Sequence, residues 1–172
     1  MRMLRRIRWV GLVVGIAAMF LFTLLLNYSV FVMIHPYLYD TYIAEGAGVT
    51  AREDALFNAL TGLSNLIATL LAFLLGGLVV GVLASAFAGL NGALSAAVAA
   101  FGGFALLVGP IVPWIWEPIS NPGEVYTRAD NLNNLLELSV IFCAVLPFVV
   151  LAGYVGGRLG ARLRNRATST TL

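Results

Sequence analysis

The sequence has little charge and few reactive side chains. Charged residues make up 10% of its 172 positions, lysine is absent, and there is one histidine and one cysteine. The single cysteine, Cys143, excludes a disulfide framework or a thiolate metal cluster within one chain, and no metal or cofactor is expected. There is also no catalytic triad pattern, H-E-x-x-H, C-x-x-C or phosphate-binding glycine loop. We therefore expect a protein that is not an enzyme.

Hydrophobic residues make up 60% of the chain, which excludes a soluble domain with a solvated surface. A transmembrane helix needs about 20 apolar residues, and the sequence offers four such runs. They are residues 10–34, 56–83, 90–116 and 135–155. The longest polar segment, residues 37–55, is too short to fold as a soluble unit. The sequence thus predicts an all-α integral membrane protein with four transmembrane helices.

The distribution of charge predicts the orientation of these helices. All basic residues are arginines, an arginine-only usage typical of a GC-rich or halophilic prokaryotic source. Eight of the ten arginines flank the first and fourth runs, at positions 2, 5, 6, 8, 158, 162, 164 and 166. By the positive-inside rule, we expect a multi-pass protein of the plasma membrane with both termini in the cytoplasm and an uncleaved signal anchor at the start. The arginines can also bind anionic lipid headgroups, although topology alone accounts for them, and they do not indicate nucleic-acid binding.

Two outer segments of the sequence resemble each other. Residues 52–60 share Arg-x-Asp-x-Leu-x-Asn-x-Leu with residues 128–136 at an offset of 76, and the Pro-aromatic-x-aromatic-acid pattern of 36–40 recurs at 113–117 at an offset of 77. We interpret this as a tandem duplication, with two-helix repeats at 1–84 and 85–163 and a flexible cytoplasmic tail at 164–172. The alternative is interface chemistry common to both segments. Aromatic residues expected to anchor the interface are Tyr37, Tyr39, Trp114 and Trp116.

A duplicated two-span unit keeps its orientation, so the repeat predicts a 2+2 helix bundle with a pseudo-two-fold axis along the membrane normal. Prolines in the outer segments are expected to end or bend helices, and Pro110 and Pro147 to kink the third and fourth spans. Residues 84–92 are expected to form a tight turn. Glycine pairs expected to bring helices together are Gly77 with Gly81 and Gly153 with Gly157.

A polar stripe follows one face of the second span from the outer surface inward, and the fourth span begins in the same way. The candidate site residues are Asp54, Asn58, Thr61 and Asn65, with Asp130, Asn134 and Glu137 in the second copy. Thr69 continues the stripe, and Thr23 and Asn27 of the first span either meet the vestibule that the stripe predicts or bond to the helix beside them. Polar groups at membrane depth avoid lipid, so the stripe predicts an acidic outer vestibule between the second and fourth helices.

Two functions remain open. The first is a non-enzymatic membrane protein that acts by helix packing with itself or with a partner membrane protein, in which the stripe is an interhelical hydrogen-bond network. The alternative is a small oligomeric transporter or channel for a cation or polar solute. In that case the carboxylates and amide oxygens are the entry site, and Glu137, the deepest acid, is its most important residue.

Overall fold

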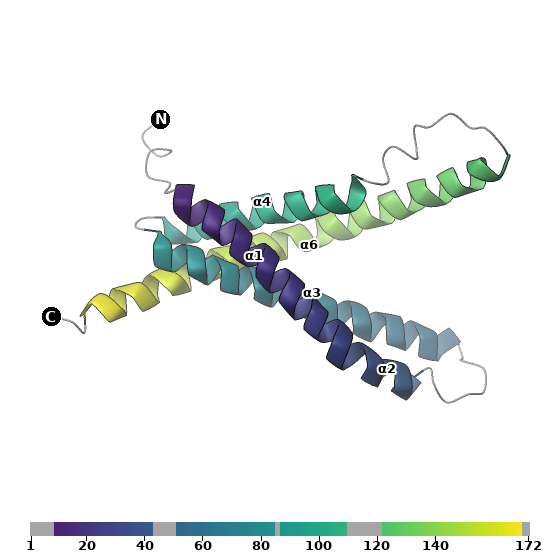
Figure 1. Ribbon diagram of the computed structural model, residues 1–172, viewed down its shortest axis with the longest axis horizontal. Coiled ribbons are helices and arrows are strands. Elements are labelled where there is room, and N and C mark those ends of the chain that lie inside the picture. Colours follow the sequence, from purple (N-terminus) through teal and green to yellow (C-terminus); the bar gives the residue numbers. More distant parts are fainter. Residues whose placement is uncertain (1–8, 43–50, 85–86, 110–121, 170–172) are drawn as a thin grey trace.

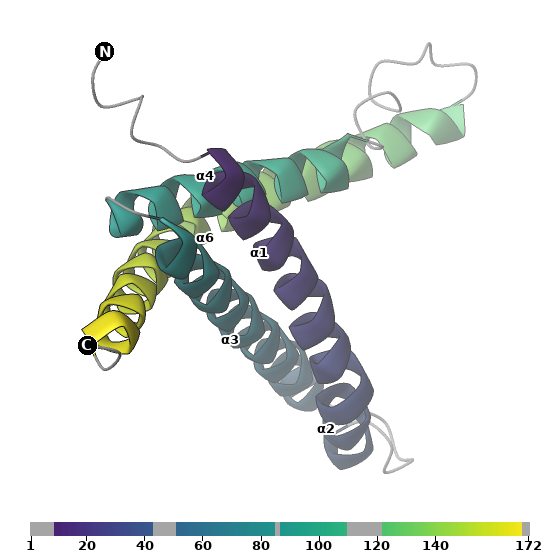
Figure 2. The ribbon, with the colours of Figure 1, turned by 60° about the vertical axis from the view of Figure 1, so that its left-hand side comes forward.

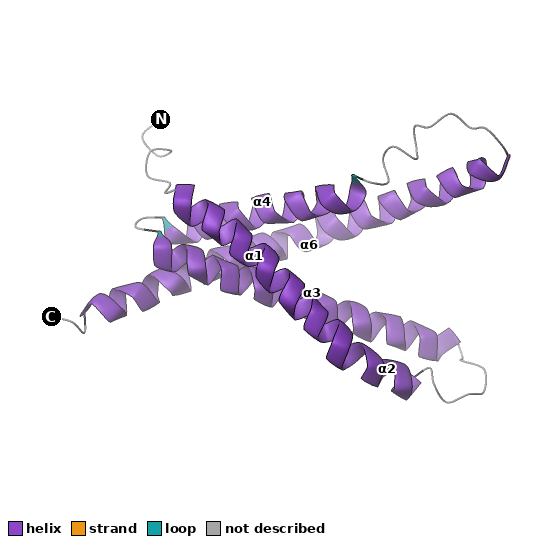
Figure 3. Ribbon diagram, in the orientation of Figure 1, coloured by secondary structure: helices purple, strands orange, loops and turns teal. Residues whose placement is uncertain are grey.

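The computed structural model describes residues 9–42, 51–84, 87–109 and 122–169, and it is built from helices (Figure 3). In chain order the elements are α1 (Trp9–Ser29), the π-helix η2 (Val30–Ile34), α2 (His35–Tyr42), α3 (Ala51–Leu83), α4 (Ala88–Val108) and α6 (Pro122–Ser169). Four helical stretches are long and apolar enough to cross a membrane. The predicted all-helical fold with four candidate spans is therefore confirmed.

The helices form two hairpins that cross near one end of the molecule and diverge toward the other (Figure 1). α1 begins, α3 ends, α4 begins and α6 ends at the same end of the molecule (Figure 1). This end carries Arg158, Arg162, Arg164 and Arg166 of α6 and is called the arginine end below. At the opposite end, α1, η2, α2 and α3 form a first arm, and α4 and α6 form a second arm (Figure 2). The helices thus pack tightly only around their crossing and not along their whole length.

Glycines allow α3 and α6 to cross in direct backbone contact. A Cβ atom built on Gly77 would lie 3.0 Å from the Gly153 Cα, and one built on Gly81 would lie 2.8 Å from the Gly157 carbonyl carbon. Even a methyl group at these positions would require the two backbones to separate. Because lipid supplies no hydrophobic drive between helices, such close packing is a main source of attraction between them.

The buried core lies at the same crossing. Met19 of α1 is completely buried and packs with side chains of the other three long helices. The remaining buried members of this cluster are Phe73, Ala96, Ala99 and Val149. α1 comes close to α3 because a Cβ on Gly76 would lie 3.1 Å from the Met19 Cα. Small residues on α3 and α4 therefore make room for the Met19 side chain.

The first helix does not end at Pro36. Proline has no N–H group, and the preceding turns adopt the wider π spacing, in which the His35 N–H donates to the Val30 carbonyl oxygen. The helix then continues as α2 to Tyr42. The outer segment around Pro36 is thus a continuation of the helix with a local change of winding, rather than its end.

Aromatic contacts hold the outer part of the first arm together. The His35 ring lies 5.5 Å from Phe31 and makes an edge contact with Phe57 of α3 at 5.2 Å. Tyr39 makes a second edge contact with Phe57 at 6.3 Å. Such pairs contribute about 0.5–1.5 kcal/mol each beyond their area burial. The only histidine of the chain therefore packs as an aromatic ring between helices.

The last helix is longer than the sequence predicts. α6 continues through Pro147 to Ser169, so residues 164–169 are its final turns and not part of a flexible tail. Figure 2 shows α6 changing direction between the second arm and the arginine end. The predicted turn at 84–92 is too long, because α3 ends at Leu83 and α4 already begins at Ala88, so residues 88–92 belong to the helix. Pro110 lies outside the described residues.

Replacing Gly77 by alanine is expected to destabilise the crossing by about 1–3 kcal/mol, because the added methyl group would press on the α6 backbone. Gly62→Ala, on the exposed face of the same helix, meets nothing within 4 Å. That variant should be neutral or stabilising by up to about 1 kcal/mol, since alanine favours the helix. Thermal unfolding in detergent, followed by circular dichroism, measures both. Equal effects of the two substitutions would contradict backbone contact at Gly77.

Candidate functional site

The polar stripe of α3 begins in solvent and becomes half-buried toward the crossing. Asp54 and Asn58 are exposed, whereas Thr61 and Asn65 are partly covered. The Thr61 hydroxyl oxygen is buried and has no hydrogen-bond partner among the described residues. At this position the stripe is therefore not the closed hydrogen-bond network that one interpretation of the sequence requires.

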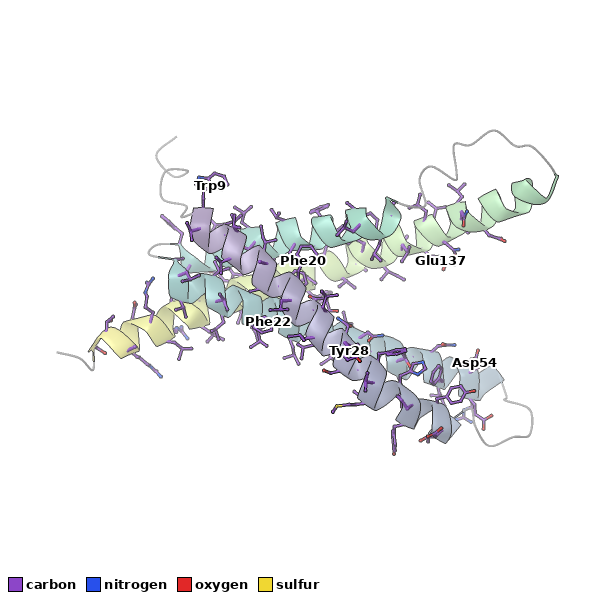
Figure 4. The ribbon with its side chains drawn as sticks, viewed as in Figure 1. Trp9, Phe20, Phe22, Tyr28, Asp54 and Glu137 are labelled. Atoms are coloured by element: carbon purple, nitrogen blue, oxygen red, sulfur yellow. The ribbon has the colours of Figure 1, made fainter. Side chains whose placement is uncertain are left out.

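The second set of candidate residues lies on the other arm. Asp130, Asn134 and Glu137 are all exposed on the outer half of α6. Figure 4 labels Asp54 and Glu137 and places them on different arms, beyond the point where the helices diverge. A single chain therefore does not bring the two sets together, and the acidic vestibule between α3 and α6 stays a prediction that needs either closure of the arms or a second molecule.

Asn27 of α1 contacts the polar stripe of α3. Its side-chain amide donates to the Thr23 carbonyl oxygen at 2.9 Å and to the Thr69 hydroxyl at 3.4 Å. Of the two roles that the sequence left open for Asn27, the structure shows the bond to the neighbouring helix α3, while contact with a vestibule stays a prediction. The signal in the sequence is the spacing of Thr23 and Asn27, which puts both on one face of an otherwise apolar helix.

An apolar cavity of about 320 Å³ lies beside this polar contact, where the arms separate. Its walls come from all four long helices, and Thr23 and Thr69 are the polar residues in them. On the second arm, Phe104 and Phe142 stack with their ring centroids 4.3 Å apart. The other lining residues are Phe20, Phe73, Ala99, Ala100, Gly103, Leu107, Leu138, Ile141, Val145, Leu146 and Val149. The sequence did not predict this cavity, because its lining residues are mostly apolar, as are most residues of the four predicted transmembrane helices.

The chemistry of this region favours an apolar occupant over a cation. Hard cations need several oxygen ligands, and the cavity offers two threonine hydroxyls. No group of three or more histidine, cysteine or acidic side chains comes together in the described part of the chain. The region is thus suited to packing against a lipid chain or another apolar helix.

The expected interface anchors are divided between described and undescribed parts of the chain. Tyr37 and Tyr39 project from α2, with 70% and 47% of their surfaces exposed. This exposure at the outer end of a helix fits a ring at headgroup depth. Trp114 and Trp116 lie outside the described residues.

No protein-family model matches the chain, and neither the curated proteins nor the solved structures include one that is significantly similar to it.

A disulfide test distinguishes separated arms from a closed vestibule. In a Cys143→Ser background, Asp54→Cys with Glu137→Cys should form no intramolecular disulfide, because bridging requires Cα atoms within about 7 Å. Gly11→Cys with Leu83→Cys is the matched control and should cross-link, since a Cβ atom on Gly11 would lie 3.7 Å from the Leu83 Cβ, within the range for a disulfide. Gel mobility under oxidising conditions shows whether the disulfide forms in each of the two double-cysteine variants. A rapid intramolecular bridge between positions 54 and 137 would show that the arms close.

Proposed function

We propose that this protein is a non-enzymatic membrane protein that works by helix packing. Its docking place is the wedge, defined as the space between the two arms with the apolar cavity at its apex. The observation that carries this proposal is the divergence of the arms from the glycine crossing, with a cavity of about 320 Å³ between them. The occupant that we propose is a helix of a second copy, or of a partner membrane protein.

The second arm has the most surface available for such a partner. In the most apolar stretch of α6, 6% of the residues are buried, compared with 39% in α3. Apolar exposure alone is compatible with lipid. However, α6 also exposes Asn134 and Glu137, and polar side chains near or within the membrane are costly unless another helix hydrogen-bonds them. Docking of a second copy would supply those partners.

The proposed tandem duplication is supported by contacts within the two hairpins. Two contacts between α1 and α3 have counterparts between α4 and α6 at a constant offset of 77 residues. They are Gly15 with Val80 and Met19 with Gly76 in the first hairpin, and Gly92 with Gly157 and Ala96 with Gly153 in the second. Unrelated hairpins have no reason to share a contact register. We therefore propose that each hairpin is one copy of an ancestral two-helix unit.

The contact between hairpins follows a different offset. Gly77 meets Gly153, and Gly81 meets Gly157, which corresponds to an offset of 76. At the offset of 77 the counterparts of Gly153 and Gly157 are instead Gly76 and Val80, so the crossing does not join equivalent residues of the register that the two hairpins share. The one-residue difference between the two offsets amounts to about 100° of helix rotation. It lets the same glycines of α6 serve contacts with both α3 and α4.

An ancestral unit of this kind would have assembled as a dimer of hairpins. The wedge would then be an open side of that assembly. A second copy of the chain would dock there by the same packing of one hairpin on another.

Thiol cross-linking tests the proposed docking. Cys143 is the only cysteine in the chain and is exposed on α6 next to cavity-lining Phe142. A bismaleimide should therefore join two copies in nanodiscs or proteoliposomes. In the control, Cys143→Ser with Val13→Cys, the cysteine lies on an exposed part of α1 with no cavity-lining neighbour in the chain, and the cross-linked fraction should be much smaller.

A bulky substitution in the wedge gives a second readout of the same docking. Ile141→Trp places extra volume at the cavity wall and should lower the cross-linked fraction through Cys143. A chain that stays monomeric in bilayers at every protein-to-lipid ratio, and that retains no membrane partner after solubilisation in mild detergent, would overturn the proposal.

The transport alternative makes an opposite prediction for Glu137. Because the cavity offers a cation few oxygen ligands, we expect proteoliposomes with wild-type protein and with Glu137→Gln to show the same background cation flux. Flux of Na⁺, K⁺ and Mg²⁺ is followed with entrapped indicators, and empty liposomes are the control. A wild-type flux that disappears in Glu137→Gln would favour the transporter.

A further inference from the structure

A second hollow lies at the arginine end, far from the wedge. It has a volume of about 380 Å³ and is formed between the first turn of α4 and the last part of α6. It is called the basic pocket below. Its lining residues are Phe87, Ala88, Gly89, Leu90, Tyr154, Arg158, Ala161, Arg162 and Asn165.

Two arginines give the basic pocket a positive charge that no described acid neutralises. Arg158 and Arg162 are four residues apart, so they share one face of α6. Arg162 has no hydrogen-bond or ion-pair partner among the described residues. Every aspartate and glutamate in the chain lies between positions 40 and 54 or between 117 and 137, in the segments that form or join the outer parts of the arms. The basic pocket is therefore complementary to an anion.

Tyr154 holds one of these arginines in place. The Arg158 guanidinium lies 5.9 Å from the Tyr154 ring centroid, and its Nη1 is 3.4 Å from the tyrosine hydroxyl. Neither contact neutralises the charge. Arg164 is different, because it donates to the Ala84 carbonyl oxygen at the end of α3. Arg164 thus contacts the end of α3, whereas Arg158 and Arg162 line the hollow.

The start of α4 adds positive potential to the same pocket. Phe87 precedes the helix in a left-handed conformation, with φ of 50°, and supplies no side-chain hydrogen bond to the first turn. Helix N-termini carry a partial positive charge and free N–H groups that favour anions. A Cβ on Gly89 would lie 2.7 Å from the Tyr154 ring and 2.9 Å from the Arg158 Cγ. The absence of a side chain there is what lets both residues lie against the helix start.

An exposed apolar stripe leads away from the basic pocket along α4. It consists of Leu90, Leu94, Val98 and Phe101, whose exposed fractions are 52%, 38%, 46% and 54%. These positions share one face of the helix and span about 16 Å, roughly half the thickness of a bilayer core. A charged group at one end and an apolar track of one leaflet's depth match the two parts of a phospholipid. A free phosphate ion would use only the first part.

We propose that the basic pocket binds the phosphate of an anionic phospholipid, with Arg158 and Arg162 as the charged contacts and Asn165 as a hydrogen-bonding neighbour. One acyl chain lies along the α4 stripe. The lipid joins α4 to α6 at the arginine end, next to the glycine crossing. This binding is independent of whatever occupies the wedge.

Lipid binding to the purified full-length protein in detergent micelles tests the proposal. The probe is phosphatidylglycerol, titrated and counted by native mass spectrometry, with phosphatidylcholine as the neutral comparison. Each juxtamembrane arginine is expected to contribute about fivefold in affinity, so Arg158→Gln and Arg162→Gln should each weaken binding by about that factor, and the double variant by about 25-fold. Arg166→Gln removes the same charge from α6 outside the pocket and should leave the affinity within about twofold.

Further measurements distinguish binding of the lipid headgroup from binding of free phosphate, and a loss of binding from a loss of folding. Millimolar inorganic phosphate or glycerol phosphate should compete weakly. Leu94→Asn keeps both arginines and should still weaken phosphatidylglycerol binding, because it interrupts the apolar track. Circular dichroism and thermal unfolding verify that each variant is folded. The proposal is overturned by equal losses in Arg166→Gln and in the double variant, by equal binding of phosphatidylcholine, or by full competition from inorganic phosphate.

Discussion

The rest of the structure depends on direct backbone contact between α3 and α6. Gly77 and Gly81 meet Gly153 and Gly157 with no room for a methyl group, and this contact fixes where the two hairpins cross. In lipid, the helices gain nothing from burying apolar surface, so van der Waals contact between close backbones has to hold them together. Because the contact sits near the arginine end, the remaining length of both hairpins is free to diverge.

Divergence of the arms gives the molecule two chemically different ends. The arms carry the acidic side chains, Asn58, Asn134 and the wedge, whereas the opposite end carries the last four arginines of α6, the α3–α4 turn and the basic pocket. At both ends, the surface has side chains that lack packing or charge partners within the described part of one chain. The wedge exposes apolar and polar side chains together, and the basic pocket has charge without a counter-ion among the described residues. Both features are consistent with a protein whose environment, lipid and neighbouring membrane helices, completes its packing.

Much of the fold followed from the sequence, because apolar runs of sufficient length have few alternatives to a helix in a membrane. The end of α3 at Leu83 was predicted correctly, whereas α4 begins at Ala88, inside the segment that the sequence assigned to the turn. Helix continuation past Pro36 was not predicted, because the wider π winding that accommodates the proline leaves no clear mark in composition. Helix formation by residues 164–169 was also missed, since their polarity indicated a tail.

The sequence by itself determined the number of candidate spans, the separation of acids from arginines and the face on which each polar stripe lies, because these depend on composition and helical period. Only the tertiary structure decided which faces meet. It paired Asn27 with Thr69, left Glu137 on an arm separate from Asp54, and gathered Arg158 and Arg162 beside the start of α4. The physical reason is that a helix crossing is set by the few places where two backbones can approach, and a one-dimensional pattern does not record the angle at which they do so.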